Sequence, residues 1–437
     1  MTAQVSAVGL DFGTTNSAIA IVAGDGAPRL ARFAADTAGA PETETFRSIL
    51  FFESTEESGG TEAALSVGND AIRRYLAAGG NGRLIQSLKS FLADRTFQST
   101  DIMGESYTLG DLIAPILIKL RESAEAQFGP LPARIVVGRP VHFSDAQTPA
   151  DDAAARARLD LAIRRAGWDE VVFEYEPVAA AYEYARRITR DETVLIADFG
   201  GGTSDFSLLR LKAPRTGAAG PRARFEILGT DGVAIAGDAF DGRMIHHVVA
   251  PALGRGSKYR SPYGATLPAP TWPYARLERW HHLSMLKTRA TLFRLRELAR
   301  ESIEPAKIAG LIHVIDSDLG YYIFREVERT KLALSSDEAA DFSFADPPTT
   351  IRRVIGRAEL NDWIAHLLGE IAGCVDRLMR GAALGRAQVD SVFLTGGSSF
   401  VPAVRAIFEA RFGAERIKMG NEFTSVARGL ALRALEA

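Results

Sequence analysis

The sequence contains only one cysteine, Cys374, among its 437 residues. A single cysteine excludes an internal disulfide and fits a reducing compartment. Because an isolated cysteine is usually a small buried hydrophobic residue, we expect Cys374 to serve packing rather than chemistry. Residues 1–9 also lack the basic segment and the apolar run of a secretory signal. Together these absences predict a cytoplasmic protein.

The chain also lacks long apolar runs and a strong charge of either sign. No uncharged apolar run approaches the roughly 18 residues that a membrane span needs. The 51 Lys and Arg residues nearly balance the 54 Asp and Glu residues, which leaves a formal net charge of −3. This balance gives no electrostatic reason to expect nucleic acid or an anionic membrane as a partner. The length instead predicts a globular protein of two or three domains.

Segments typical of strands and of helices alternate along the chain. Residues 194–197 and 392–394 are short apolar runs typical of buried strands, whereas residues 151–166 and 176–187 carry helix start and stop signals. Alternation of this kind favours an α/β fold in which helices cover largely parallel sheets.

Two stretches, VGLDFGTTNSAIAIV (8–22) and VLIADFGGGTSDFSLLRL (194–211), repeat one pattern. In each, an apolar strand ends in Asp-Phe-Gly, and small polar residues and a second strand follow. Such a repeat predicts two similar halves of one fold, facing each other across a cleft that binds a ligand.

The two turns have the residue types that an anion requires. Gly13 permits a tight turn, and the glycines of the second turn let the backbone approach a phosphate closely. Asp11 and Asp198 would repel phosphate unless a cation lay between them, so we expect Mg²⁺ held largely through water. The Walker A pattern is absent, as is a dinucleotide-binding G-x-G-x-x-G after a strand. The residues that offer N–H groups and hydroxyls are Thr14, Thr15, Asn16, Gly200, Gly201, Gly202 and Thr203.

Two later segments would suit the same cleft. Residues 324–335 predict a helix with Glu328, Lys331 and Ser335 on one face, although a solvated Glu–Lys pair would show the same spacing. Residues 392–408 read as a strand, a double-glycine turn and a helix. There, Gly396 and Gly397 would admit a flat ring, and Phe400 could stack on a base.

In order and combination, six segments resemble the ATPase domain of the heat-shock-70 (DnaK-type) chaperones, which belong to the actin, hexokinase and heat-shock ATPase superfamily. The segments are LDFGTTNS, EPVAAA, ADFGGGTSD, GDAFD, ERTKLALS and LTGGSSFVP, and they span residues 8 to about 402. The segment GRPVHF (138–143) and the aromatic-rich stretch 255–282 look closer to the truncated, YegD-type branch of that family.

The resemblance implies an α/β fold of two actin-like (ribonuclease H-like) lobes around a central nucleotide cleft. Each lobe would have a mixed sheet flanked by helices and an inserted subdomain. Lobe I would span 1–192, with its insert at about 46–112, and would be completed by the C-terminal helix at about 405–437. Lobe II would span 193–404, with its insert at about 246–349. No peptide-binding β-sandwich is expected in this sequence.

The resemblance also implies ATP or ADP with Mg²⁺ as cofactors, and it assigns roles to individual residues. Those near the reacting phosphate or the hydrated ion would be Asp11, Lys89, Glu176, Asp198 and Asp205. The first phosphate loop would be Thr14, Thr15 and Asn16, and the second Gly200, Gly201, Gly202 and Thr203. Further nucleotide contacts would come from Gly237, Asp238, Glu328, Lys331, Ser335, Gly396, Gly397, Ser398 and Phe400, the last replacing an arginine that commonly stacks on adenine.

We therefore expect a slow ATPase whose lobes open and close with the nucleotide, serving as a chaperone or as a nucleotide-switched regulator. Two alternatives have the same fold: an actin-like filament protein that assembles with nucleotide, and a kinase for a small molecule. Residues 255–282 combine prolines and aromatics without a regular pattern. Aromatic residues argue against disorder, so we expect an ordered surface segment there that contacts a protein partner.

Overall fold

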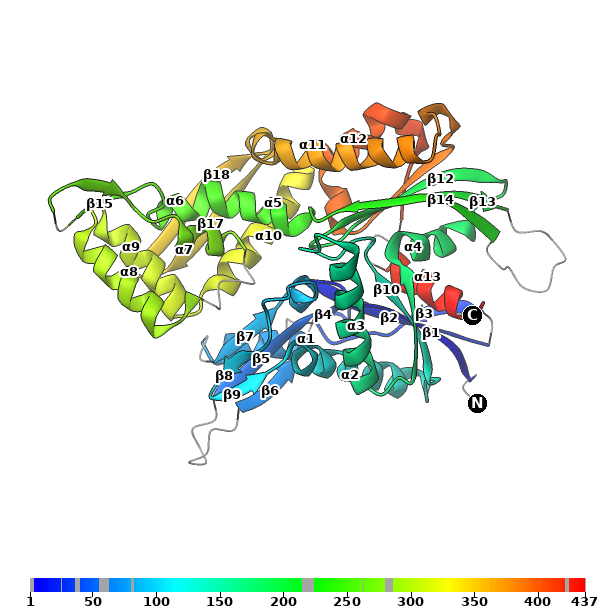
Figure 1. Ribbon diagram of the computed structural model, residues 1–437, viewed down its shortest axis with the longest axis horizontal. Coiled ribbons are helices and arrows are strands. Elements are labelled where there is room, and N and C mark those ends of the chain that lie inside the picture. The colour runs from blue at the N-terminus through cyan, green and yellow to red at the C-terminus, as the bar shows by residue number, and fades with distance from the viewer. Residues whose placement is uncertain are drawn as a thin grey trace.

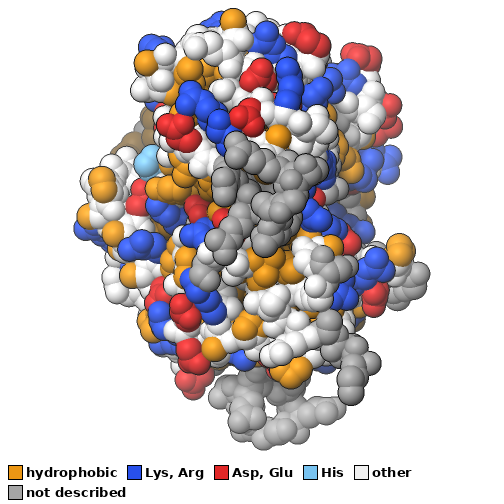
Figure 2. Space-filling view, turned by 90° about the vertical axis from the view of Figure 1, so that its right-hand side faces the viewer, with side chains coloured by type: hydrophobic (Ala, Val, Ile, Leu, Met, Phe, Trp, Pro, Cys, Tyr) orange, Lys and Arg blue, Asp and Glu red, His pale blue; other side chains and the backbone are white. Residues whose placement is uncertain are grey.

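The computed structural model describes residues 4–436 except 25, 36–39, 55–62, 80–81, 214–223, 262, 280–285 and 421–423. The chain forms two lobes, each built on a mixed sheet flanked by helices (Figure 1). Among the described residues, none of the helices combines the length and the apolar character that a membrane crossing demands. On the face shown in Figure 2, acidic and basic side chains are interspersed.

The sheet of lobe I is built around the first Asp-Phe-Gly strand. Its central strand pairs in parallel with one neighbour and antiparallel with the other. The strand order is β11 (Glu170–Tyr175), β10 (Arg134–Arg139), β1 (Val5–Asp11), β2 (Asn16–Ala23) and β3 (Ala27–Leu30), with β4 (Phe46–Arg47) pairing with the start of β2.

The sheet of lobe II repeats this arrangement around the second Asp-Phe-Gly strand. Its strand order is β20 (Ile417–Met419), β19 (Ser391–Thr395), β12 (Glu192–Phe199), β13 (Ser204–Lys212) and β14 (Arg224–Val233). The first three strands run parallel and the last two pair antiparallel, as in lobe I. The predicted duplication is therefore present in the strand topology.

The helices of lobe I begin at strong capping signals. Thr108 and Asp111 form a capping box at the start of α2 (Leu109–Phe128), and Thr148 and Asp151 do the same for α3 (Pro149–Arg165). The helix α4 (Glu176–Ala185) begins with a proline in its first turn, where the missing N–H costs nothing. The helices predicted over 151–166 and 176–187 are α3 and α4.

Two helices, α4 and α13 (Ser425–Ala434), lie between the two sheets (Figure 1). Their apolar side chains form one core cluster with Val136 of β10, Ile196 of β12 and Phe393 of β19. The backbones approach so closely that a Cβ on Gly429 would lie 1.7 Å from the carbonyl oxygen of Ala179. Small residues along this seam therefore join the two lobes.

The outer face of lobe II is covered by helices that follow its inserted segment. These helices are α11 (Arg357–Gly381) and α12 (Pro402–Phe412), and the short helices η5 (Arg386–Gln388), η6 (Gly397–Phe400) and η7 (Ala414–Arg416) contact α12. Cys374 is fully buried on α11, and burial raises the pKa of its thiol, which confirms its predicted packing role.

Each lobe carries an inserted subdomain, and the two subdomains touch across the cleft. Tyr75 of the first packs against Tyr321 of the second with ring centroids 5.6 Å apart, and the Tyr75 hydroxyl donates to the carbonyl oxygen of Asp318. The first contains β5 (Ile49–Ser54), β6 (Ala63–Val67), α1 (Gly68–Ala77), β7 (Arg83–Gln86), η2 (Leu88–Phe91), β8 (Thr100–Ile102) and β9 (Glu105–Tyr107). The second contains α5 (Gly237–Met244), η3 (Ile245–Val249), α6 (Ala250–Ala252), β15 (Lys258–Arg260), β16 (Thr266–Pro268), α7 (Trp272–Leu277), α8 (Arg289–Glu301), α9 (Pro305–Asp316), α10 (Gly320–Ser336), β17 (Ala339–Asp346) and β18 (Thr349–Gly356).

The packing of two segments differs from the predicted domain boundaries. The prediction places residues from about 405 in lobe I. In the structure, Val404 and Phe408 of α12 are buried in the core of lobe II. The next helix, α13, is the one that packs on the lobe I sheet. The prediction also ends the second insert at about 349, but this position would divide the antiparallel hairpin of β17 and β18. That hairpin carries the insert to Gly356.

The aromatic segment 255–282 is ordered over its described residues but is more regular than predicted. It forms the hairpin of β15 and β16 and then the helix α7. Tyr274 and Leu277 of α7 are buried in the core of lobe II, whereas Tyr263 at the hairpin tip is 97% exposed. Part of the aromatic content therefore anchors the segment. Residues 262 and 280–282 of the predicted stretch lie outside the described residues.

Candidate active site

The two Asp-Phe-Gly hairpins meet at their tips. In β1 and β2, Asp11 pairs with Ala18, and in β12 and β13, Asp198 pairs with Asp205. A Cβ on Gly201 would lie 2.9 Å from the Thr15 hydroxyl and 3.5 Å from the Cβ of Thr14. The first predicted phosphate loop therefore lies directly against the second.

Acidic side chains surround one lysine beneath these tips. The Lys89 ammonium donates to Glu176 Oε1 over 2.6 Å, and the two side chains are only 9% and 8% exposed. Lys89 comes from η2 in the first insert, and Glu176 opens α4. Asp205 accepts a hydrogen bond of 2.6 Å from the backbone N–H of Val141, so its carboxylate is held in place.

The electrostatics of this cluster show that its acids are close together. Burial, assisted by the charge of Glu176, raises the pKa of Asp11 and of Asp205 to about 7 each, although Lys89 lowers both. Burial raises the pKa of Asp198 well above its usual value, with further contributions from Glu176, Asp11 and Asp205. Burial also disfavours the charged amine of Lys89, but Glu176 and Asp11 outweigh that effect and raise its pKa.

This donor set fits a divalent cation by its charge. Four carboxylates lie around a single ammonium, so a bound cation would relieve the repulsion among them. Within the described residues, no group of three or more His, Cys, Asp or Glu side chains has the geometry to hold a metal directly. An ion held mainly through water, near Asp11 and Asp198, would not need such a group. The magnesium site stays a prediction.

A second buried ion pair lies beside the second hairpin. Lys331 Nζ of α10 lies 2.7 Å from Asp241 Oδ1 of α5. A Cβ on Gly237 would lie 2.9 Å from the Ser398 hydroxyl and 3.5 Å from Lys331 Nζ. The predicted residues Gly237, Lys331 and Ser398 are therefore neighbours, although they come from three separate segments.

The start of α5 is tied to the second hairpin as well. The backbone N–H of Asp238 donates to the carbonyl oxygen of Gly201 over 2.8 Å. Burial, together with repulsion from Asp241, raises the pKa of Asp238 to about 7. Asp241 was not predicted as a site residue, although it closes the quoted GDAFD segment. Asp241 lies four residues after Gly237, a spacing that places the two residues on the same face of a helix.

Arg47 connects the lobes at another point and was also not predicted. Its guanidinium donates to Asn16 Oδ1 over 3.3 Å and lies 3.7 Å from Glu328 Oε2 of α10. The predicted residue Glu328 thus pairs with lobe I rather than with Lys331. Nothing in the local sequence around Arg47 marks it, because its partners lie in distant segments.

The remaining predicted residues have contacts that do not link them directly to the two hairpins. Gly396 has a φ of +81°, and a Cβ there would lie 2.1 Å from the carbonyl oxygen of Phe199. Its lack of a side chain therefore serves the close approach of β19 to β12. Gly397 starts η6, which ends at Phe400, a side chain that is 37% exposed. The Ser335 hydroxyl donates to the carbonyl oxygen of Lys331 within α10.

The space beside the second hairpin is small. A cavity of about 260 Å³ opens there, and Ser90, Ser144, Gly202 and Asp238 contribute to its wall. Ligand sites usually enclose roughly 300–1,000 Å³. Since even a Cβ on Gly201 would lie only 2.9 Å from the Thr15 hydroxyl, the hairpin tips leave little room between them in this arrangement of the lobes.

Comparison with known protein families identifies the family of this chain. The model of the family described as Hsp70 protein matches residues 83–256 and 316–435, which together exceed half of the chain. These ranges include Lys89, Glu176, the second hairpin, α10 and the turn after β19, and they leave the first hairpin outside. The two-lobed architecture agrees with the actin-like ATPase fold. The chain therefore belongs to the Hsp70 family.

Proposed function

We propose that this protein binds ATP with Mg²⁺ between its lobes and hydrolyses it slowly to ADP and phosphate. The observation that carries the proposal is the pair of facing hairpins with one lysine and four acids beneath them. The hairpins offer backbone N–H groups and hydroxyls to an anion, while the acids and the lysine supply charge where a terminal phosphate would react.

Phosphoryl transfer to water depends mainly on positioning and charge neutralisation. A bound magnesium ion would supply most of the positive charge around the phosphates. In this scheme the Lys89 ammonium binds the terminal phosphate, and its hydrogen bond with Glu176 orients it. Glu176, Asp198 and Asp205 then surround and orient the attacking water, and one of the three carboxylates accepts its proton.

The nucleotide contacts at the other end of the cleft would select and hold adenosine. We assign this role to Lys331 and Glu328 on α10, with Phe400 as the stacking residue for the base. The ion pairs that these lysine and glutamate side chains now form with Asp241 and Arg47 keep them at the cleft. When the nucleotide binds, Lys331 and Glu328 would each give up part of the ion pair and form a contact with the nucleotide instead.

Separate contacts join the two lobes across the cleft. Tyr75 packs on Tyr321, and Arg47 pairs with Glu328, so closure depends on interactions at separate points. We propose that ATP stabilises one lobe arrangement and that hydrolysis shifts the equilibrium, which would make the protein a nucleotide-switched regulator or chaperone.

The proposal is tested by calorimetry with ATP, ADP and GTP, with and without Mg²⁺, alongside measurement of phosphate release. We expect adenine nucleotides to bind more tightly than GTP and Mg²⁺ to be required for hydrolysis. Absence of ATP binding would refute the proposal. Light scattering that rises with ATP would indicate filament assembly, and phosphorylation of an added metabolite faster than phosphate release would indicate a kinase.

A further inference from the structure

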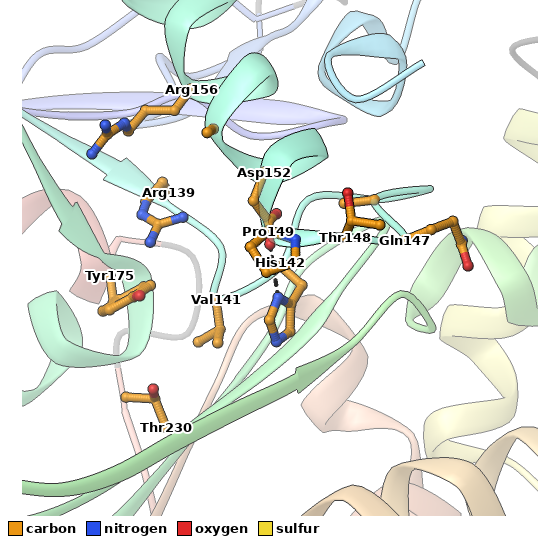
Figure 3. A pocket seen from close by; sticks show the side chains of 12 residues that line it. Arg139, Val141, His142, Gln147, Thr148, Pro149, Asp152, Arg156, Tyr175 and Thr230 are labelled. Atoms are coloured by element: carbon orange, nitrogen blue, oxygen red, sulfur yellow. Dashed lines mark hydrogen bonds and ion pairs between the residues drawn. The ribbon is translucent and has the colours of Figure 1, made fainter. Parts of the chain in front are cut away.

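A larger pocket lies beside the active site, where the two lobes meet. Its volume is about 610 Å³, within the range of small-molecule sites. Figure 3 shows that its wall comes from the end of β10, the following loop, the start of α3, the end of β11 and, from lobe II, the strand β14. Nothing in the nucleotide scheme uses this pocket.

The wall carries two arginines that form no ion pair with an acid in the described part of the chain. Arg139 and Arg156 extend into the same side of the pocket (Figure 3). Over the described residues, no carboxylate lies within 4.0 Å of either guanidinium. The acid in the wall, Asp152, is already engaged, because it accepts hydrogen bonds from His142 Nδ1 at 2.9 Å and from the backbone N–H of Phe143 at 2.8 Å. Among the described residues, the pocket wall therefore has two cationic side chains and one anionic side chain, and neither arginine is in an ion pair.

One of the arginines is also held in position. The guanidinium of Arg139 lies 4.3 Å from the centroid of the Tyr175 ring, and the two residues are paired across β10 and β11. Stacking of this kind restricts the side chain without using its N–H donors. A planar guanidinium with free donors is well suited to bind a phosphate or a carboxylate through two hydrogen bonds.

We propose that this pocket binds a small molecule that carries a phosphate or a carboxylate group. Arg139 and Arg156 would bind the anionic group. Tyr175 offers the edge of an aromatic surface for the rest of the molecule, and Thr230 offers a hydroxyl from the opposite lobe. An anionic group would give both arginines the charge partner that they do not have among the described residues.

The pocket shares its wall with the active site, so the ligand would act on the nucleotide cycle; this consequence rests on the proposed function. Val141 lines the pocket, and its N–H holds the carboxylate of Asp205. Tyr175 immediately precedes Glu176, which pairs with Lys89. A ligand that spans Arg139 and Thr230 contacts both lobes, and any preference for one lobe arrangement must appear reciprocally in nucleotide affinity.

Calorimetry on the nucleotide-free protein tests the binding, with phenyl phosphate and benzoate as probes. We expect saturable binding of at least one probe, and the tighter one identifies the anionic group. Arg139→Gln and Arg156→Gln should each weaken it about tenfold. The matched control is Arg294→Gln, because Arg294 is an exposed arginine of α8 that also has no carboxylate within ion-pair distance in the described part of the chain. It should bind like the wild type.

Saturable binding by neither probe, or equal affinity of the wild type and the Arg139→Gln/Arg156→Gln double variant, would overturn the proposal. Repeating the titration with saturating ATP and with ADP tests the coupling. An affinity that differs between the two states supports it, and identical affinities refute it. If the protein binds a probe through these arginines but does not bind ATP, the pocket proposal is supported and the proposed function is refuted.

Discussion

The strongest test of the site is the removal of the Lys89 ammonium. Lys89→Met keeps an unbranched side chain but leaves Glu176 without its partner at 2.6 Å, in a cluster with Asp11, Asp198 and Asp205. Removing one member of a buried ion pair costs about 3–5 kcal/mol of stability. We expect that loss in the nucleotide-free protein at pH 8, in the presence of a chelator.

The loss should depend on pH in a defined direction. The pKa of Asp11 and of Asp205 is about 7 in the folded chain, far above the unfolded value, so the folded state holds protons that the unfolded state has released. Stability from these groups is therefore highest below the ordinary carboxyl pKa of 3.8, falls as the pH rises from there to about 7, and levels off above it. Without Lys89 the repulsion among the carboxylates is larger, so the difference between variant and wild type should grow from pH 6 to pH 8, as urea unfolding would show.

Catalysis supplies the second readout. Lys89→Met should retain ATP binding but lower phosphate release at least tenfold, equivalent to about 1.4 kcal/mol of transition-state stabilisation. The matched control is Lys331→Met, which also breaks a buried ion pair, 2.7 Å long, but at the adenosine end. It should raise the KM for ATP more than it lowers kcat. Wild-type turnover in Lys89→Met, or the same kinetic change in both variants, would refute the assigned roles.

Three further predictions concern other parts of the site. Gly201→Ala adds a methyl group 2.9 Å from the Thr15 hydroxyl and should destabilise the protein by about 1–3 kcal/mol. The control Gly200→Ala places its methyl group 3.5 Å from the nearest atom and should destabilise the protein less. Equal urea midpoints for the two variants would contradict this prediction. Phe400→Ala should weaken adenine nucleotides by about 0.5–1.5 kcal/mol in calorimetry, and unchanged affinity would exclude stacking. Replacing the hairpin 258–268 by a short turn should leave ATP affinity unchanged, whereas Tyr274→Ala should lower stability by about 3–5 kcal/mol in thermal unfolding; loss of ATP binding in the hairpin variant would give that hairpin a structural role.

Much of the architecture could be predicted because the sequence repeats itself. The second Asp-Phe-Gly segment marks the strand that is topologically equivalent to the first, and the strand orders of the two sheets agree with that repeat. The helix that carries Glu328 and Lys331 could be predicted from the periodicity of its own residues. These are local signals, and they depend little on how the lobes pack.

The contacts that complete the site could not be predicted, because they join segments far apart in the chain. Arg47 precedes Glu328 by almost three hundred positions, and no local pattern indicates that they meet. The amphipathic pattern of α12 would be the same whichever lobe it covered, so the boundary near 405 was misplaced. Gly396 could be recognised as a turn glycine, but its approach to Phe199 depends on the pairing of two strands.

The close contact between Ala179 and Gly429 has a consequence for how the cleft opens. At that point backbone meets backbone, so neither helix can slide or tilt far without collision or the loss of packed surface. A relative rotation of the lobes, as proposed above, would then pivot near this contact. A small angle there becomes a wide displacement at Tyr75 and Tyr321, while groups close to the axis, such as the Glu176 carboxylate at the start of α4, travel little. An opening of this kind would widen the cleft at its rim and leave the cluster around Glu176 nearly in place.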